Sequence, residues 1–220
     1  MQESLFFYDK SAVKRWGVLG IYIAFMLILQ FTLGFILGML GYVGKVEYFN
    51  TLLIFDIIQL LVFALLFKIY KIKVFNFKAI TKKNILFTVV VFLVIMLLSY
   101  TYDYLFKGIE IKNQITLEKL MQNSNIVVVF LSIVVLGPIF EELMFRVVVL
   151  NLFGRRWRIL GLLVSTLAFT LVHIPTNLPS FIIYFTMGFG LGLIYYLTDN
   201  IELAIAIHMI NNFIAFLQMI

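Results

Sequence analysis

The sequence predicts an all-α protein, a polytopic bundle of about seven transmembrane helices. Of its 220 residues, 63% are hydrophobic and 13% are charged, and the mean hydropathy is +1.08. Soluble domains contain roughly 45–50% apolar and about 25% charged residues. Most apolar residues fall in runs long enough to cross the ~30 Å hydrocarbon core of a bilayer. Lys and Arg gather between alternate pairs of runs, a distribution typical of cytoplasmic loops.

Seven apolar runs approach the ~20 residues that a helical span needs. The first follows a charged stretch and is about 25 residues long, so we expect it to remain as a helix and not to be cleaved as a signal peptide. The expected spans are residues 17–42, 49–67, 85–106, 126–152, 159–174, 181–198 and 202–219.

The basic residues between these spans predict a cytoplasmic N-terminus. Three clusters fall on one side of the membrane if the chain starts inside, which leaves near-neutral loops around 43–48, 107–125 and 175–180 outside. With seven spans the C-terminus is then outside. The clusters are Lys10, Lys14 and Arg15; Lys68, Lys71, Lys73, Lys78, Lys82 and Lys83; and Arg155, Arg156 and Arg158.

The spans divide the chain into two parts. Residues 1–125 hold three spans and an outer loop, in which residues 115–121 have the pattern of a short amphipathic helix on the membrane surface. Residues 126–220 hold four spans and the polar residues suited to catalysis. No soluble domain is expected, because the longest polar stretch has too few apolar residues to bury a core.

Composition excludes several kinds of chemistry and partner. The chain has no Cys, which excludes disulfides, thiolate metal ligands and a cysteine nucleophile. The net charge of +6 lies in the expected cytoplasmic loops, so it indicates contact with membrane lipids and no nucleic-acid partner. Small residues predict close helix contacts at a GxxxG pair, Gly34 and Gly38, and at a second cluster, Gly188, Gly190 and Gly192.

Two glutamates and two histidines inside the expected spans are the best indication of function. An ionisable side chain within a span costs several kcal/mol unless it is paired or lines a wet cavity. Glu142 and Arg146 are four residues apart, so their side chains are expected to pair on one helix face. Glu141 points about 100° away and is left free to bind a water or a cation. Pro138 is expected to kink this helix and free a carbonyl near the site.

The histidines lie on later spans. His173 ends the fifth span, four residues after Phe169, and His208 shares a helix face with Asn212. Imidazoles and carboxylates are the side chains that hold zinc or position an attacking water. At a helical rise of 1.5 Å per residue, the distances of Glu141, His173 and His208 from the cytoplasmic ends of their spans differ by up to about 12 Å. This is a wide spread in membrane depth for a single site.

Three ordered motifs resemble those of the CPBP intramembrane proteases, also called the Abi or type II CAAX prenyl endopeptidase family. They are Glu-Glu-x-x-x-Arg at 141–146, Phe-x-x-x-His at 169–173 and His-x-x-x-Asn at 208–212. The resemblance covers roughly residues 126–217, and three motifs in order argue against a chance match. The family commonly has Gly after the motif arginine, whereas this chain has Val147.

The resemblance implies hydrolysis of a peptide bond within the membrane. It makes Glu141 the general base, His173 its partner or a metal ligand, and His208 with Asn212 the stabilisers of the oxyanion. Glu142 and Arg146 orient this constellation. If the enzyme depends on a metal, a divalent ion such as zinc is expected on Glu141, His173 and His208. Metal-dependent and glutamate-dependent mechanisms both stay open, although the chain lacks HExxH.

Two other classes of function stay open. Buried carboxylates and histidines also serve proton- or cation-coupled transporters, and Asp56 in the second span fits such a relay. A non-catalytic protein that binds a membrane partner or confers immunity is the other class. Under the protease hypothesis the substrate is a membrane-associated peptide or lipidated protein, in peptide maturation or bacteriocin self-immunity, and the expected location is the bacterial cell membrane.

Overall fold

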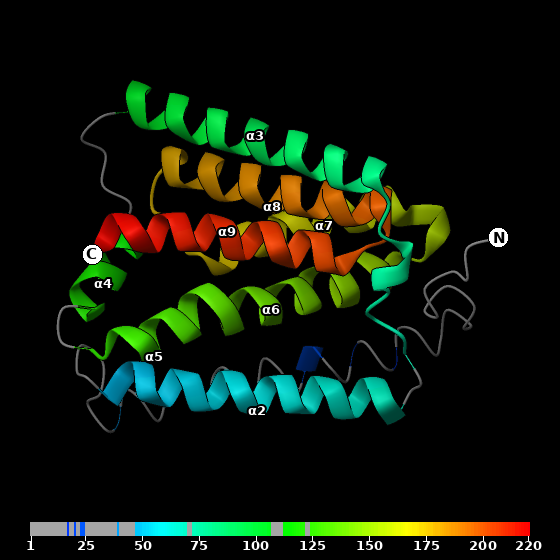
Figure 1. The fold of residues 1–220 in the computed structure, drawn as a ribbon, viewed down its shortest axis with the longest axis horizontal. Coiled ribbons are helices and arrows are strands. Elements are labelled where there is room, and N and C mark those ends of the chain that lie inside the picture. The colour runs from blue at the N-terminus through cyan, green and yellow to red at the C-terminus, as the bar shows by residue number, and fades with distance from the viewer. Residues whose placement is uncertain are drawn as a thin grey trace.

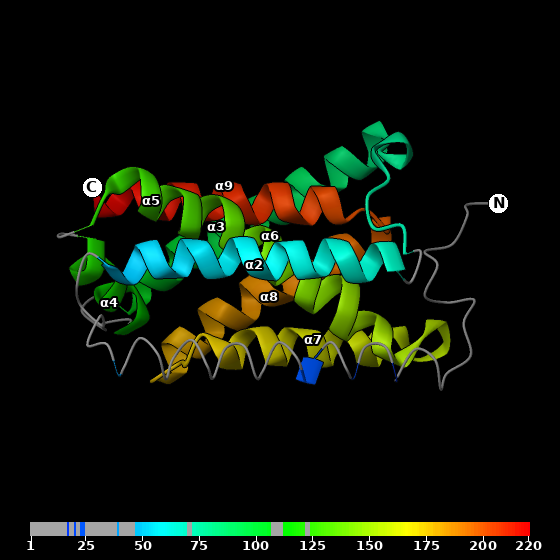
Figure 2. The same ribbon diagram turned by 90° about the horizontal axis from the view of Figure 1, so that it is seen from below.

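A computed structural model describes residues 47–69, 72–106, 112–121 and 124–220, with a few isolated positions before residue 47. Every regular element within these residues is a helix (Figures 1 and 2), as the predicted all-α class requires. In chain order the elements are α2 (Glu47–Ile69), η1 (Phe77–Ala79), α3 (Lys82–Leu105), α4 (Lys112–Met121), α5 (Ile126–Phe130), η2 (Leu131–Leu136), α6 (Gly137–Glu142), η3 (Leu143–Val149), η4 (Leu150–Phe153), η5 (Arg155–Trp157), α7 (Arg158–Val172), α8 (Leu178–Thr198) and α9 (Ile201–Met219).

Five helices of the described part are long and apolar enough to cross a membrane. They are Tyr48–Ile69, Lys82–Tyr102, Ile126–Phe153, Leu178–Thr198 and Ile201–Met219. These helices confirm five of the seven expected spans. The expected first span, 17–42, lies almost entirely outside the described residues, as do Gly34 and Gly38.

The expected fifth span, 159–174, is a shorter helix than its sequence suggests. α7 has 15 residues, Arg158–Val172, which is about 22 Å at 1.5 Å per residue and less than the ~30 Å core. The helix stops because a proline disfavours the α conformation in the residue before it. Here Ile174, which precedes Pro175, adopts a left-handed φ of 49°. His173 therefore lies at the end of a helix and not within one.

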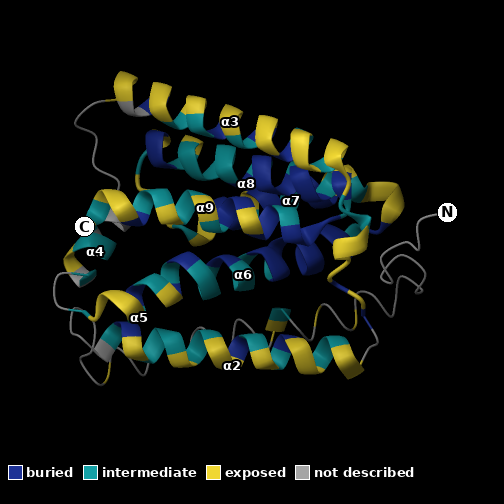
Figure 3. Ribbon diagram, viewed as in Figure 1, coloured by how far each residue is buried: buried dark blue, intermediate teal, exposed yellow. Residues whose placement is uncertain are grey.

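The outer faces of the bundle are apolar and the polar interior lies on the later helices. On α2 and α3, Leu61, Leu86 and Leu97 are 65%, 66% and 64% exposed. Figure 3 shows exposed residues along these two flanking helices and buried residues gathered on α6, α7, α8 and α9. An exposed apolar surface on helices of this length suits contact with lipid chains. The fold is that of a multi-pass membrane protein.

Most of the described basic residues gather at one end of the bundle. α2 ends and α3 begins at the end where η4, η5 and the start of α7 also lie (Figure 1). This places Lys68, Lys73, Lys78, Lys82 and Lys83 at the same end of the bundle as Arg155, Arg156 and Arg158, the arrangement that the positive-inside rule requires. α4, the expected amphipathic helix, lies at the opposite end. The cytoplasmic N-terminus itself stays a prediction.

Glycines let α7 approach its neighbours closely. A Cβ on Gly161 would lie 2.0 Å from the carbonyl oxygen of Leu150, so α7 packs directly on the backbone of η4. A Cβ on Gly188 would lie 2.8 Å from Cδ1 of Phe169, and one on Gly192 would lie 2.6 Å from Cδ1 of Leu162. The predicted close packing at Gly188, Gly190 and Gly192 is therefore confirmed.

Candidate active site

The helix that carries Glu141 and Glu142 changes its hydrogen-bond register on both sides of them. α6 lies between two π-helical segments, η2 and η3, and π-turns within α-helices frequently occur at functional sites. In η2 the Gly137 N–H donates to the carbonyl of Ser132, five residues earlier. The corresponding donor for Ile133 would be residue 138, but Pro138 has no N–H. The prediction that Pro138 frees a carbonyl near the site is confirmed.

Asn212 supplies the missing donor. Its Nδ2 lies 2.9 Å from the carbonyl oxygen of Ile133 and donates to it. A polar side chain at membrane depth thus satisfies a backbone group that the proline leaves open. This contact differs from the predicted one, in which Asn212 and His208 address the same small group. The oxyanion role of Asn212 stays a prediction.

Glu142 and Arg146 form the ion pair that their spacing predicts. Arg146 Nε lies 2.8 Å from Glu142 Oε2, and both side chains are fully buried. Arg146 also donates to the Ser165 hydroxyl at 2.9 Å, and its guanidinium lies 5.1 Å from the centre of the Phe169 ring. Pairing and hydrogen bonding together offset the cost of burying two charges.

His208 joins this buried pair from α9. Its Nδ1 lies 3.0 Å from Glu142 Oε1, and its side chain is 1% exposed. Because Glu142 accepts from both Arg146 and His208, the carboxylate ties α6 to α9. The contact assigns the imidazole proton to Nδ1 and leaves Nε2 as an acceptor.

Glu141 lies between the two histidines. Its Oε2 is 3.7 Å from Nε2 of His208 and 3.9 Å from Nε2 of His173, and this oxygen has no hydrogen-bond partner. Nδ1 of His173 lies 2.7 Å from the carbonyl oxygen of Phe169, so its proton also belongs on Nδ1. With both imidazoles neutral and Glu141 ionised, three acceptor atoms face one another, and no donor from the described residues lies between them. A water molecule brings two hydrogens and so satisfies two of the three, whereas a cation placed among them faces all three.

The predicted spread in depth of about 12 Å is wrong, because Glu141, His173 and His208 converge. The estimate measured each residue from the end of its own span and treated those ends as level. The helices cross at visible angles (Figures 1 and 2), and π-helical turns interrupt the helix that carries Glu141. The predicted separation of the two glutamates is correct: the Glu141 side chain is 27% exposed, whereas that of Glu142 is fully buried.

Phe169 forms the wall that the cationic and imidazole groups share. Its ring is fully buried. The centre of the Phe169 ring lies 4.5 Å from the centre of the His173 ring and 5.7 Å from that of the His208 ring. Gly188 makes room for it, since any side chain there would meet the ring. The ring excludes water from the Arg146 side of the site, which strengthens the charge interactions there.

Sequence reasoning missed Ser165, Tyr184 and Asn151. Tyr184 stacks on His173 with ring centres 4.5 Å apart and an interplanar angle of 29°. Asn151 is fully buried and its Nδ2 lies 2.9 Å from both the Val147 carbonyl oxygen and the Tyr195 hydroxyl. For Ser165 the sequence did contain a signal. This residue lies four residues before Phe169 and eight before His173, so helical spacing places all three on one face.

The three facing acceptors match zinc in kind but not in spacing. One carboxylate oxygen and two imidazole nitrogens are common zinc ligands, which in tetrahedral geometry lie about 3.3–3.5 Å apart. The observed 3.7 and 3.9 Å are wider. Among the residues that the structure describes, no group of three or more His, Cys, Asp and Glu side chains is arranged to hold a metal ion. The mechanism below uses no metal.

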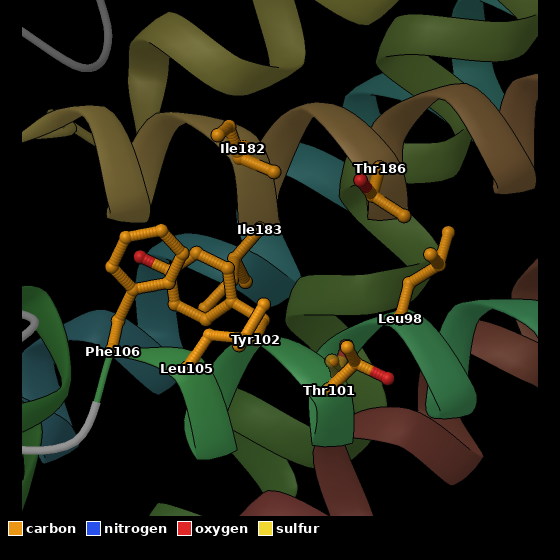
Figure 4. Close-up of a pocket in the computed structure, with 9 residues that line it drawn as sticks. Leu98, Thr101, Tyr102, Leu105, Phe106, Ile182, Ile183 and Thr186 are labelled. Atoms are coloured by element: carbon orange, nitrogen blue, oxygen red, sulfur yellow. The ribbon is translucent and has the colours of Figure 1, made fainter.

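A pocket of about 180 Å³ lies between α3 and α8 (Figure 4). Apolar side chains dominate its lining, including Leu98, Tyr102, Leu105, Phe106 and Ile183. None of the residues that line it belongs to the Glu141 cluster. The pocket is a feature of the apolar flank of the bundle and not of the candidate active site.

Fold and site together define a multi-pass membrane protein with an ion-paired glutamate, arginine and histidine cluster inside its helix bundle. Residues 123–214, which contain the whole cluster, match the family model described as type II CAAX prenyl endopeptidase, Rce1-like. The resemblance read from the three motifs is therefore confirmed over this segment, and the matched family is one of peptidases.

A relative from Lactococcus lactis subsp. lactis (strain IL1403), the UPF0177 protein YaiH, resembles the chain along almost its full length. It is 29% identical over 226 residues, which cover 99% of this chain and 80% of the relative. Its name states no activity. No solved structure matches the chain.

Proposed function

We propose that the protein is an intramembrane endopeptidase in which Glu141 activates a water molecule. One observation carries the proposal: Oε2 of Glu141 has no hydrogen-bond partner and lies within 3.9 Å of two imidazole Nε2 atoms. A water placed among them donates one hydrogen to Glu141 and the other to an imidazole. The match to a peptidase family supports the same chemistry.

The reaction needs only one proton carrier. As the water oxygen bonds to the carbonyl carbon of the substrate, Glu141 takes a proton from the water and the carbonyl oxygen gains negative charge. As the carbon–nitrogen bond breaks, Glu141 returns that proton to the departing nitrogen. The products are a carboxylic acid, which ionises, and an amine. One of the two imidazoles accepts the second hydrogen of the water, and the pair of Glu142 and Arg146 holds His208.

The neighbours of the cluster preorganise it before substrate arrives. Phe169 O and Glu142 Oε1 fix the two imidazoles through Nδ1, and Tyr184 and Phe169 hold the His173 ring by stacking. Fixed dipoles of this kind reduce the reorganisation that the reaction requires. Glu141 and His173 are 27% and 18% exposed, so substrate approaches from their side.

The proposed substrate is a membrane-associated peptide or a lipidated protein, because Glu141 and His208 lie within helices long enough to cross a bilayer. The bacterial relative supports a location in the bacterial cell membrane. We propose peptide maturation or self-immunity to a bacteriocin as the setting. Cleavage after removal of metal ions decides whether a metal ion takes the place of the water as the partner of the three acceptors.

The test compares membrane and secreted peptides from a deletion strain complemented with wild type, with Glu141→Gln, or with Glu118→Gln at matched protein levels. Glu118 lies on α4, far from the cluster, and controls for loss of an acidic group. Peptides that wild type and Glu118→Gln produce, and Glu141→Gln does not, support the proposal. Identical peptides from all three strains with full rescue by Glu141→Gln would overturn it in favour of a binding protein.

A further inference from the structure

α2 presents two unpaired polar side chains to the helix that carries Glu141. One face of α2 carries four residues at successive spacings of seven, three and four: Phe49, Asp56, Gln59 and Phe63. The two aromatic residues at the ends of this face are buried at 0% and 1% exposure. Phe63 contacts Phe140, the residue before Glu141, with ring centres 5.7 Å apart. The face therefore packs against α6 and η2, as Figure 1 also shows.

Gln59 is buried without a partner for its oxygen. The residue is 2% exposed, and its Oε1 accepts no hydrogen bond. An amide oxygen left unpaired in this way costs about 1–3 kcal/mol. Among the described residues no donor reaches this oxygen, so a bound molecule that carries a donor would relieve the cost.

Asp56 is an ionisable residue in the middle of a span. It lies close enough to Glu141 for the two carboxylates to repel each other. Among the described residues no cationic side chain pairs with it, since the ion pairs there involve Arg146, Arg158, His173 and His208. An unpaired carboxylate at this depth marks a functional site by default. The repulsion and the burial are both relieved by a positive charge placed between Asp56 and Glu141.

We propose that Asp56 and Gln59 form a subsite for a cationic group of the substrate, an ammonium or guanidinium, next to the bond that Glu141 hydrolyses. This inference rests on the proposed function. An ammonium brings three hydrogens and a guanidinium five, which suits a set of acceptors that has no donor of its own. The adjacent carboxylates of Asp56 and Glu141 then compensate its charge. The subsite selects peptides with Lys, Arg or a free N-terminus beside the cleaved bond.

The experiment uses the full-length protein in membranes and a substrate taken from the wild-type-specific peptides of the preceding test. Three forms of this peptide are compared: the native form, one with the Lys and Arg residues near the cleaved bond replaced by norleucine, and one with an acetylated N-terminus. The second and third forms distinguish a side-chain cation from a terminal ammonium. Each is cleaved by wild type, by Asp56→Asn and by the control Glu118→Gln.

We expect wild type and Glu118→Gln to prefer one charged form over its neutral counterpart by about tenfold to a hundredfold in kcat/KM, the ratio that one charge-assisted hydrogen bond provides. Asp56→Asn is expected to lose this preference, so that its kcat/KM falls much more for the charged form than for the neutral form. Equal losses by Asp56→Asn on charged and neutral forms would overturn the subsite, as would an unchanged preference. A dependence of wild-type cleavage on Na⁺ that Asp56→Asn abolishes would also overturn it and assign the site to an inorganic cation.

The two proposals fail differently. If wild type and Glu141→Gln yield the same peptides, the protease hypothesis falls before the subsite is tested. If wild type cleaves and Asp56→Asn retains full discrimination, the protease stands and only the subsite falls.

Discussion

Glu141 and Glu142 are adjacent in the chain, yet their carboxylates have opposite environments. Glu142 is fully buried and accepts hydrogen bonds from Arg146 and His208. The Glu141 side chain is 27% exposed, and its Oε2 accepts none. The Glu142 carboxylate thus joins two helices, and the Glu141 carboxylate is the one that we propose to react.

Substitution of the two glutamates by Gln should separate stability from activity. Glu142→Gln leaves Arg146 buried without its counter-charge and should cost about 3–5 kcal/mol, whereas Glu141→Gln breaks no hydrogen bond and should leave stability nearly unchanged. Unfolding followed in detergent micelles measures the first effect, and peptide cleavage measures the second. A Glu142→Gln variant as stable as wild type would contradict the role assigned to the pair.

Asn212 and Pro138 should be energetically coupled. Asn212→Ala leaves the Ile133 carbonyl without a donor and should cost about 1–3 kcal/mol. Pro138→Ala restores an N–H at position 138, so the same Asn212→Ala change should cost about 1 kcal/mol less in that background. A double-mutant cycle of unfolding free energies checks the coupling. Equal costs in both backgrounds would show that Asn212 does not compensate for the proline.

Contacts within one helix were predictable from the sequence. The Glu142–Arg146 pair and the carbonyl that Pro138 frees both follow from helical spacing and from the missing proline N–H. Five spans follow from the length and hydropathy of their runs. The end of α7 was misplaced because the apolar run continues through Ile174, while Pro175 stops the helix at Val172.

Contacts between helices were not predictable in the same way. His208 meets Glu142 across 66 residues of sequence, and Asn212 meets Ile133 across 79. These contacts depend on how the helices tilt and slide against one another, which π-turns and glycine contacts decide. Glycine marked where α8 packs closely, but no local signal showed that the space at Gly188 belongs to the ring of Phe169.

Tyr184 should position His173 through its ring. Tyr184→Ala removes the stacked partner of the imidazole and should lower kcat/KM by up to about tenfold, because such ring pairs contribute about 0.5–1.5 kcal/mol. Tyr184→Phe keeps the ring and should retain most of the activity. If the Phe variant is as impaired as the Ala variant, the hydroxyl and not the ring is responsible.

Gly188→Ala should reduce activity by displacing Phe169. The new Cβ would lie 2.8 Å from Cδ1 of a fully buried ring that contacts both His173 and His208. We expect cleavage to fall by about tenfold or more, since a small misplacement of reacting groups is costly.

Gly190→Ala is the matched control for this change. Its Cβ would meet Cδ1 and Cγ1 of Ile95, on α3, at 2.5 and 2.9 Å, and not the ring of Phe169. Its effect on cleavage should be smaller at equal amounts of folded protein. Equal loss in the two variants would place the effect in general packing of α8 and not in the position of Phe169.

Removal of metal ions should leave cleavage intact if water alone joins Glu141 to the two histidines. Glu141 Oε2 lies 3.7 Å from Nε2 of His208 and 3.9 Å from Nε2 of His173, and both distances exceed the roughly 3.3–3.5 Å between tetrahedral zinc ligands. We therefore expect the protein, after dialysis against a chelator, to cleave at the untreated rate and to contain far less than one zinc per chain by elemental analysis. Loss of cleavage that one equivalent of zinc restores in wild type, but not in His173→Gln, would instead show that the three side chains close around a metal ion.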